Sequence, residues 1–218
     1  MSLKAHLRPD VRVAAVERDL VILDIGGDTY LCLPDGAQAW SDLMCGLESP
    51  GVAALVGALL EGGLAEAGDA KPCEGLPPAL PSTCLLDGPV GPVRWRDWVA
   101  LVGAYLDLRM RYEKRSFAEI LSFVRSRTPT EGSGVCHEEL GRLCRAFERL
   151  VVWLPASGKC LVRSFLLLRF LQRSGADATW VFGVETWPFE AHCWLQAGDA
   201  VLDDRPERVA AYAPIHAV

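Results

Sequence analysis

The sequence of 218 residues has no apolar run long enough to cross a membrane, which takes about 20 residues. Its longest apolar stretch, residues 161–171, is interrupted by Arg163 and Arg169. The N-terminus also lacks the apolar segment of a secretory signal peptide. We therefore expect a soluble, cytoplasmic protein that has no membrane partner.

The eight cysteines include no Cys-x-x-Cys pair and are scattered along the chain. Without a secretion signal, reduced thiols explain them better than disulfides do. The nearest approach to a zinc site, Cys136 and His137 with Cys144, is better explained by small thiols packed along a helix. A phosphate-binding glycine loop is also missing. We predict no metal ion and no other cofactor.

Basic residues are scarce in the first 70 positions, where four Lys and Arg stand against eleven Asp and Glu, a net charge of −7. The remaining residues are nearly neutral, with 18 basic and 17 acidic side chains. Nucleic-acid binding needs basic side chains that contact phosphates. The first third of the chain therefore argues against a nucleic-acid partner and suits a ligand that carries positive charge.

The first 68 residues predict a three-stranded antiparallel meander followed by helices. Apolar residues alternate over 11–15, residues 20–25 are rich in Leu, Val and Ile, and Gly26-Gly27 forms a turn into a strand at 29–33. Ser49-Pro50 is a helix-start signal, and apolar residues follow it at helical spacing. Residues 69–91 are rich in Pro and Gly and predict a linker.

Helical patterns predominate from residue 92. One helix begins at Cys160, ends near Gly175 and carries apolar residues on nearly all sides, so we expect it to be central and buried. Strand-like segments follow at 178–184, 192–196 and 201–203. The chain is therefore expected to have an α+β fold with domains at 1–68 and 92–218.

Cys160, His192 and an aspartate come in the order of a thiol-nucleophile triad. Cys160 opens a helix, whose dipole favours the thiolate and lowers the thiol pKa from about 8.5. His192 would take the thiol proton and later protonate the leaving amine. A two-residue turn at 198–199 would place Asp203 on the His192 face of the sheet, whereas a three-residue loop would place Asp204 there. The pattern leaves both aspartates open.

Two neighbours of this triad are interpreted from the sequence as well. Cys193 alternates to the opposite face of the strand from His192, which makes it a poor alternative nucleophile. The segment 187–189, Trp-Pro-Phe, is expected to be a loop that either shapes the cleft or simply packs.

The segments Cys-Leu-Val-Arg-Ser at 160–164 and Ala-His-Cys-Trp at 191–194, together with Asp204, resemble the lasso-peptide B proteins. These are transglutaminase-like cysteine peptidases that mature lasso peptides. The family pattern reads Cys-Leu-x-Arg-Ser, then His-Ala-Trp, then an acidic residue twelve positions after the histidine. The resemblance therefore selects Asp204 as the carboxylate of the triad. Cys193 stands where the family pattern has alanine, which replaces one small residue by another on the strand face opposite His192. The resemblance implies a papain/transglutaminase-like domain over residues 92–218.

The N-terminal meander and helices resemble the RiPP recognition element, a PqqD-like winged-helix module that binds the leader of a ribosomal precursor peptide. The leader would add as a strand to a sheet edge and pack beside the last helix. By this resemblance the edge is offered by Tyr30, Leu31, Cys32 and Leu33, and the groove is lined by Leu55 and Leu59. The two leucines fit an ordinary core role equally well.

The resemblance implies that the protein binds the leader and cleaves it from the core peptide with Cys160, His192 and Asp204. It also implies a separate ATP-dependent, asparagine-synthetase-like partner that cyclises the freed core. Two other hypotheses stay open. The same triad could transfer the acyl group to an amine, as a transglutaminase does, or the chain could be a non-catalytic peptide-binding adaptor in which Cys160 only packs.

Overall fold

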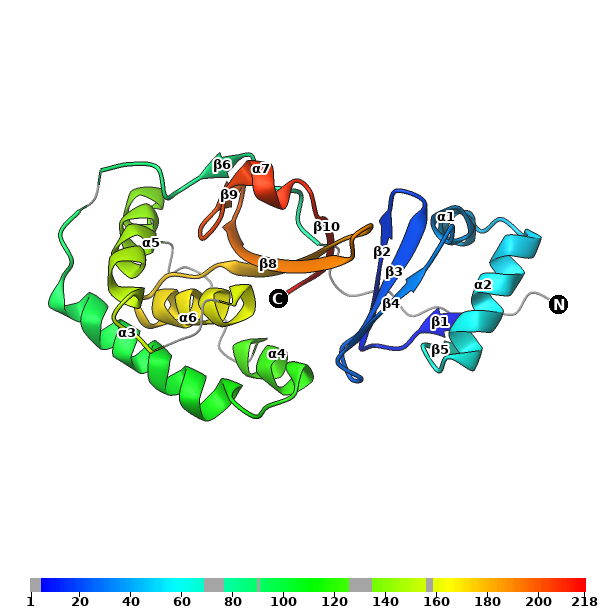
Figure 1. The fold of residues 1–218 in the computed structure, drawn as a ribbon, viewed down its shortest axis with the longest axis horizontal. Helices are drawn as coiled ribbons and strands as arrows, with labels where there is room; N and C mark the ends of the chain where they lie inside the picture. The colour runs from blue at the N-terminus through cyan, green and yellow to red at the C-terminus, as the bar shows by residue number, and fades with distance from the viewer. Residues whose placement is uncertain (1–4, 69–76, 90, 126–134, 156–158) are drawn as a thin grey trace.

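The computed structural model describes residues 5–68, 77–89, 91–125, 135–155 and 159–218. Its helices and three sheets confirm the predicted α+β class. Figure 1 shows two groups of elements along the longest axis, the N-terminal strands and helices at one end and the larger C-terminal group at the other. Within the described ranges, no helix combines the length and the apolar character needed to cross a bilayer.

The N-terminal group, called the N-terminal module below, is built around the predicted meander. Its strands are β2 (Val11–Val16), β3 (Asp19–Asp24) and β4 (Thr29–Leu33), in the antiparallel order β2-β3-β4. The helices α1 (Ala37–Met44) and α2 (Pro50–Glu61) follow. The Ser49 hydroxyl accepts a hydrogen bond from the Val52 N–H, so α2 begins as predicted. A pairing of β1 (Ala5–Leu7) with β5 (Ala65–Ala67), which the sequence patterns did not predict, closes the module.

Strand β3 is buried on both faces, which explains its continuous run of apolar residues. Leu20 and Ile22 pack in a small core with α2. Val21 and Leu23 point to the other side and join the main core, which continues into the C-terminal group. The N-terminal module is therefore packed against the rest of the chain, where β2 contacts the strands β7 (Thr179–Glu185) and β10 (Ala213–Ala217).

The C-terminal group packs its longer helices on one side of a five-stranded sheet, and a short helix lies on the other side, where its Val209 packs with Val181 and Trp194 (Figure 1). The helices are α3 (Trp95–Asp107) with its π-helical continuation η1 (Leu108–Tyr112), α4 (Phe117–Arg125), α5 (His137–Val151), α6 (Cys160–Arg173) and the short α7 (Pro206–Val209). The sheet order is β10 (Ala213–Ala217), β7 (Thr179–Glu185), β8 (Glu190–Ala197), β9 (Ala200–Val201) and β6 (Thr83–Cys84). Helix α6 is the predicted central helix, because every residue from Ser164 to Leu171 is buried.

Part of the predicted linker belongs to this sheet. Strand β6 pairs in parallel with β9, and the Ser82 N–H donates to the Asp199 carboxylate at 3.0 Å. The carbonyl oxygen of the buried Leu85 accepts a hydrogen bond from Arg145 at 2.8 Å. A two-residue strand carries no periodic signal, which is why the Pro- and Gly-rich composition hid it. Residues 69–76 and 90 of the expected linker lie outside the described residues.

Candidate active site

Cys160 is the first residue of α6 and lines two adjoining cavities of about 320 and 180 Å³. A hydrogen bond from the Cys193 thiol and one from the His192 ring lower the pKa of the Cys160 thiol to about 4, against the opposing effect of burial. The backbone N–H of Cys193 and the positive end of the helix dipole favour the same charge. At neutral pH this sulfur is therefore a thiolate.

His192 on β8 lies between this sulfur and Asp204. Its Nε2 atom is 2.6 Å from Asp204 Oδ2, which leaves Nδ1 as the nitrogen for Cys160. Burial lowers the pKa of His192, but the contacts with Cys160 and Asp204 outweigh it and raise the pKa above its usual range. The ring also packs against Tyr212, with centroids 5.1 Å apart. The structure thus brings the three predicted triad residues together, in an arrangement that favours a thiolate beside a protonated imidazole.

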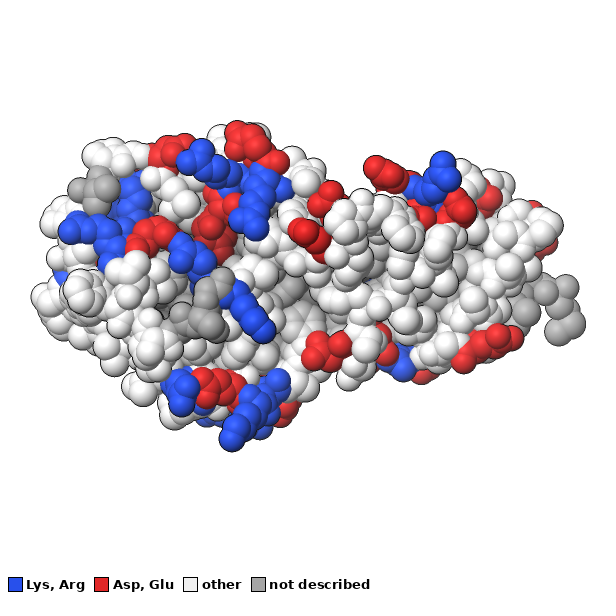
Figure 2. Space-filling view, in the orientation of Figure 1, with Lys and Arg blue, Asp and Glu red and all other residues white. Residues whose placement is uncertain are grey.

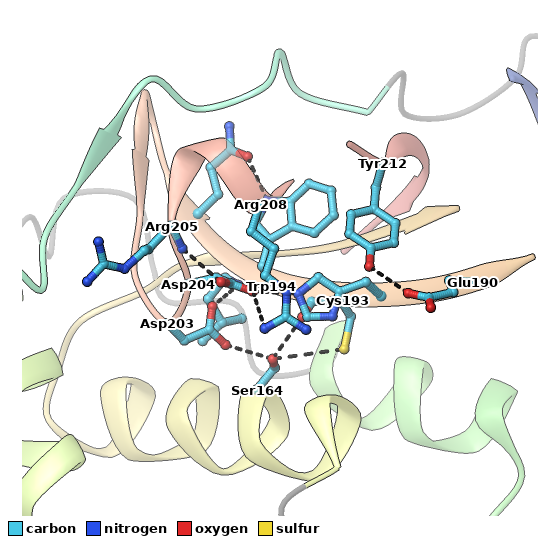
Figure 3. A network of polar contacts seen from close by, with 12 residues as sticks. Ser164, Glu190, Cys193, Trp194, Asp203, Asp204, Arg205, Arg208 and Tyr212 are labelled. Atoms are coloured by element: carbon cyan, nitrogen blue, oxygen red, sulfur yellow. Dashed lines mark hydrogen bonds and ion pairs between the residues drawn. The ribbon is translucent and has the colours of Figure 1, made fainter. Parts of the chain in front are cut away.

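The two aspartates have different partners, and strand parity does not separate them. The turn between β8 and β9 has two residues, yet β9 ends at Val201, so alternation does not extend to Asp203. Asp203 instead accepts hydrogen bonds from the Ser164 hydroxyl at 2.7 Å and from the Leu195 N–H at 2.8 Å (Figure 3). Asp203 therefore links α6 and β8 through hydrogen bonds. Asp204 contacts His192, as the family pattern implied.

Cys193 is the site neighbour that the sequence interpretation undervalued. It does lie on the opposite face of β8 from His192, but that face packs on the first turns of α6. Its sulfur is 3.9 Å from the Ser164 hydroxyl oxygen, and Figure 3 shows it directed toward that side chain. The same thiol hydrogen-bonds to Cys160. The far face is therefore part of the site, a fact that strand alternation alone does not reveal.

The smaller cavity joins the N-terminal module to the Cys160 sulfur. Its walls include Asp28 and Tyr30 from the module and apolar side chains from the C-terminal group, among them Phe117, Leu161 and Phe182. The loop between β7 and β8 bridges the same junction. The Tyr30 and Phe189 rings lie 5.5 Å apart, and Trp187 Nε1 donates to the Asp19 carboxylate at 2.5 Å. This loop therefore packs against the module and shapes the junction. The sequence patterns had not singled out Asp28.

The residues predicted to bind a leader differ in accessibility. Strand β4 is an edge strand on which Leu31 and Cys32 are exposed, whereas Tyr30 and Leu33 are half-buried. Leu55 and Leu59 are only 6% and 3% exposed and pack in the small core with Leu20 and Ile22. Both leucines thus serve as core residues in this structure, and little of either side chain faces solvent.

Charge is distributed unevenly over the surface. On the face shown in Figure 2, Lys and Arg side chains lie mainly over the C-terminal group, and the N-terminal module shows mostly uncharged and acidic residues. This agrees with the net charge of −7 in the first 70 residues. In the part of the chain that the structure describes, no group of three His, Cys, Asp or Glu side chains is arranged to hold a metal ion.

Comparisons with known proteins agree with the geometry. Residues 102–217 match the profile of the transglutaminase-like superfamily. A segment of 47 residues is 43% identical to the microcin J25-processing protein McjB of Escherichia coli, covering 22% of this chain and 23% of that protein. Both matches confirm the predicted resemblance to the lasso-peptide B proteins. The chain has no significant match among solved structures.

Proposed function

The chain belongs to the transglutaminase-like superfamily, and we propose that it is a cysteine peptidase that cleaves the leader from a ribosomal precursor peptide in lasso-peptide biosynthesis. One observation carries the proposal. Cys160, at the first residue of a buried helix, contacts His192, and His192 contacts Asp204 at 2.6 Å, all beside a cavity of about 320 Å³. The similarity to a microcin J25-processing protein supports a peptide-processing role.

The mechanism follows from the charges of the three groups. The Cys160 thiolate attacks the carbonyl carbon at the leader–core junction, and the first turn of α6 can offer a backbone N–H to the oxyanion that forms. Protonated His192 gives its proton to the departing amine of the core as the C–N bond breaks. Water, deprotonated by the same ring, then hydrolyses the thioester. Asp204 holds Nε2 throughout, so that Nδ1 faces the sulfur.

The path of the leader follows from the placement of β4. As a PqqD-like module, residues 1–68 would bind the leader along the edge Tyr30–Leu33, as an added strand. Tyr30 stands both on this edge and in the wall of the smaller cavity with Cys160. A leader bound along β4 would therefore enter the cavity beside the sulfur. The low basic content of the module suits a leader that carries positive charge.

Mass spectrometry of a leader-bearing precursor tests the proposal. Wild-type protein should release a leader that ends in a free carboxylate, and Cys160→Ala should release none. Cys45→Ala is the matched control, because Cys45 is an exposed cysteine at the end of α1 in the N-terminal module. A leader that ends in an amide would identify transglutaminase-type transfer instead. Leader binding without cleavage by the wild type would identify an adaptor, and unchanged cleavage by Cys160→Ala would overturn the role of Cys160 as the nucleophile.

After cleavage, the free amine of the core would pass to a separate enzyme. We assign cyclisation to an ATP-dependent, asparagine-synthetase-like partner because amide formation from a carboxylate needs activation, which a Cys-His-Asp site does not supply. Co-purification of the two proteins with the precursor would support this partnership. Cyclised product formed by this chain alone would contradict it.

A further inference from the structure

Cys160 and Cys193 form a pair of thiols at one end of α6. Cys160 and Ser164 are four residues apart, so their side chains project from the same face of the helix. Ser164 contacts Cys193 twice, through the sulfur at 3.9 Å and through the backbone carbonyl at 3.3 Å. Cys193 therefore lies directly beneath the first turn of α6, where its thiol reaches the Cys160 sulfur.

The two thiols differ in access and in charge. Both line the two cavities, but Cys193 is only 3% exposed, whereas Cys160 is half-buried and more open to a small reagent. Cys160 carries the negative charge, and its hydrogen bond with Cys193 raises the pKa of the Cys193 thiol well above its usual range. A soluble oxidant therefore meets Cys160 first, because thiolates react and thiols do not.

Oxidation of Cys160 removes the main cause of the raised pKa of Cys193. A sulfenic acid at Cys160 is uncharged, so the largest influence that raises the pKa of Cys193 disappears. The Cys193 sulfur then lies beside an electrophilic sulfur, because its thiol is the hydrogen-bond partner of Cys160 and both residues line the same two cavities. Disulfide formation requires such proximity, and the resolving cysteine of a redox pair commonly lies beside a thiolate of low pKa.

We propose that Cys160 and Cys193 form a reversible disulfide when the protein meets a hydroperoxide. In the first step the Cys160 thiolate attacks the peroxide, a sulfur–oxygen bond forms, the oxygen–oxygen bond breaks, and the departing oxygen takes a proton to leave as water or an alcohol. In the second step the Cys193 sulfur attacks Cys160, a sulfur–sulfur bond forms, and the hydroxyl leaves with the Cys193 proton as water. Two thiols are oxidised and one peroxide is reduced.

The pair depends on a departure of this chain from the family pattern. The lasso-peptide B proteins that it resembles carry alanine where this chain has Cys193, and alanine offers no sulfur to resolve a sulfenic acid. Without a resolving thiol, Cys160 would advance to sulfinic acid, which dithiothreitol does not reduce. The disulfide would thus protect the sulfur that the proposed peptidase uses. Only the activity part of the following test depends on that proposed function.

The test treats the purified full-length protein with one equivalent of hydrogen peroxide and measures its mass. Wild type should lose two hydrogen atoms, and a non-reducing digest should join the peptides that carry Cys160 and Cys193 until dithiothreitol separates them. Cys193→Ala should instead gain oxygen at Cys160. Cys45→Ala should behave as wild type. Oxygen added at Cys160 of wild type without a cross-link, or a cross-link to another cysteine, would overturn the proposal.

Leader cleavage gives the second measurement, compared for each protein with its own untreated sample. With excess peroxide, which supplies the second equivalent that converts a sulfenic acid to a sulfinic acid, wild type should lose activity and regain it with dithiothreitol, whereas Cys193→Ala should lose it permanently. Cys193→Ser serves as the second variant if alanine prevents folding. A Cys160–Cys193 cross-link in a protein that never cleaves the precursor would refute the peptidase and leave the disulfide standing. Full recovery by Cys193→Ala would refute the protective role of Cys193.

Discussion

Replacement of His192 by alanine should raise the pKa of the Cys160 thiol by about one to three units, the effect of one adjacent opposite charge. The structure holds this pKa at about 4, with the Cys193 hydrogen bond as its first cause and His192 as its second. The variant keeps the hydrogen bond from Cys193 and loses the one from His192. At pH 5 wild-type Cys160 should be about 90% thiolate, whereas an ordinary thiol of pKa 8.5 is only about 0.03% thiolate.

The assay is thiol–disulfide exchange with an aromatic disulfide, followed from pH 3 to 10. A thiolate of low pKa is also a weaker nucleophile, and a Brønsted coefficient of about 0.45 offsets its advantage about 100-fold. The thiolate fractions of Cys160 and an ordinary thiol differ about 3,000-fold at pH 5, and the weaker nucleophilicity reduces this advantage about 100-fold. Wild-type Cys160 should therefore react only about 30-fold faster than an ordinary thiol at pH 5. The midpoint of the pH profile, rather than the absolute rate, reports the pKa. Its value should be near 4 in wild type and higher in His192→Ala.

His137→Ala is the matched control, because His137 is exposed at the start of α5 and should leave the midpoint in place. A wild-type midpoint near 8.5 would show that no ion pair forms. An unchanged midpoint in His192→Ala would show that the ring does not stabilise the thiolate. Either result would refute the charge assignment on which the proposed peptidase mechanism rests.

Three further predictions concern other parts of the molecule. Asp204→Asn should lower the pKa of His192 by removing a negative partner, so that cleavage is lost at a lower pH on the alkaline side of a pH–rate profile. Asp107 is buried, which opposes its ionisation, but hydrogen bonds from Arg173 and Arg169 lower its pKa. The ionised Asp107 therefore stabilises the folded protein fully above its usual pKa, and this contribution is lost as the pH falls through the lowered pKa. Asp107→Asn should lower the free energy of unfolding by about 3–5 kcal/mol at neutral pH, measured by urea unfolding. Leu31→Lys should weaken leader binding about tenfold in fluorescence anisotropy, because it replaces an apolar contact at the exposed edge of β4 with a positive charge that repels a positively charged leader.

The elements that position the candidate site were predictable because their signals are local. Apolar residues on nearly all sides of α6 indicate a buried helix, and the strand-like segment at 192–196 lies within β8, where it is buried on both faces. The spacing of Asp204 twelve residues after His192 was decisive only through the family pattern. Strand parity could not choose between the aspartates, because β9 ends at Val201, before either of them.

The burial of charge was not predictable, because it depends on partners far away in the sequence. Asp97 and Asp107 lie on the buried face of α3, where pattern rules place apolar residues. Asp97 is paired with Arg142, and Asp107 with Arg169 and Arg173. Several apolar side chains of α3 are exposed instead, including Trp98 and Val102. Ion pairs between helices thus decided which face of α3 turned inward.

The burial of β3 on both faces changes how recognition and cleavage would be coupled. A flexible tether raises the local concentration of a bound substrate, but it leaves the orientation of that substrate free. Here Val21 and Leu23 join the main core, and Trp187 and Phe189 contact the N-terminal module, so β4 has a fixed position relative to Cys160. A leader bound along β4 would be held in orientation as well as in proximity. The number of residues between the bound strand and the scissile bond should therefore be tightly restricted, and insertion of two glycines at that place in the precursor should abolish cleavage without weakening binding.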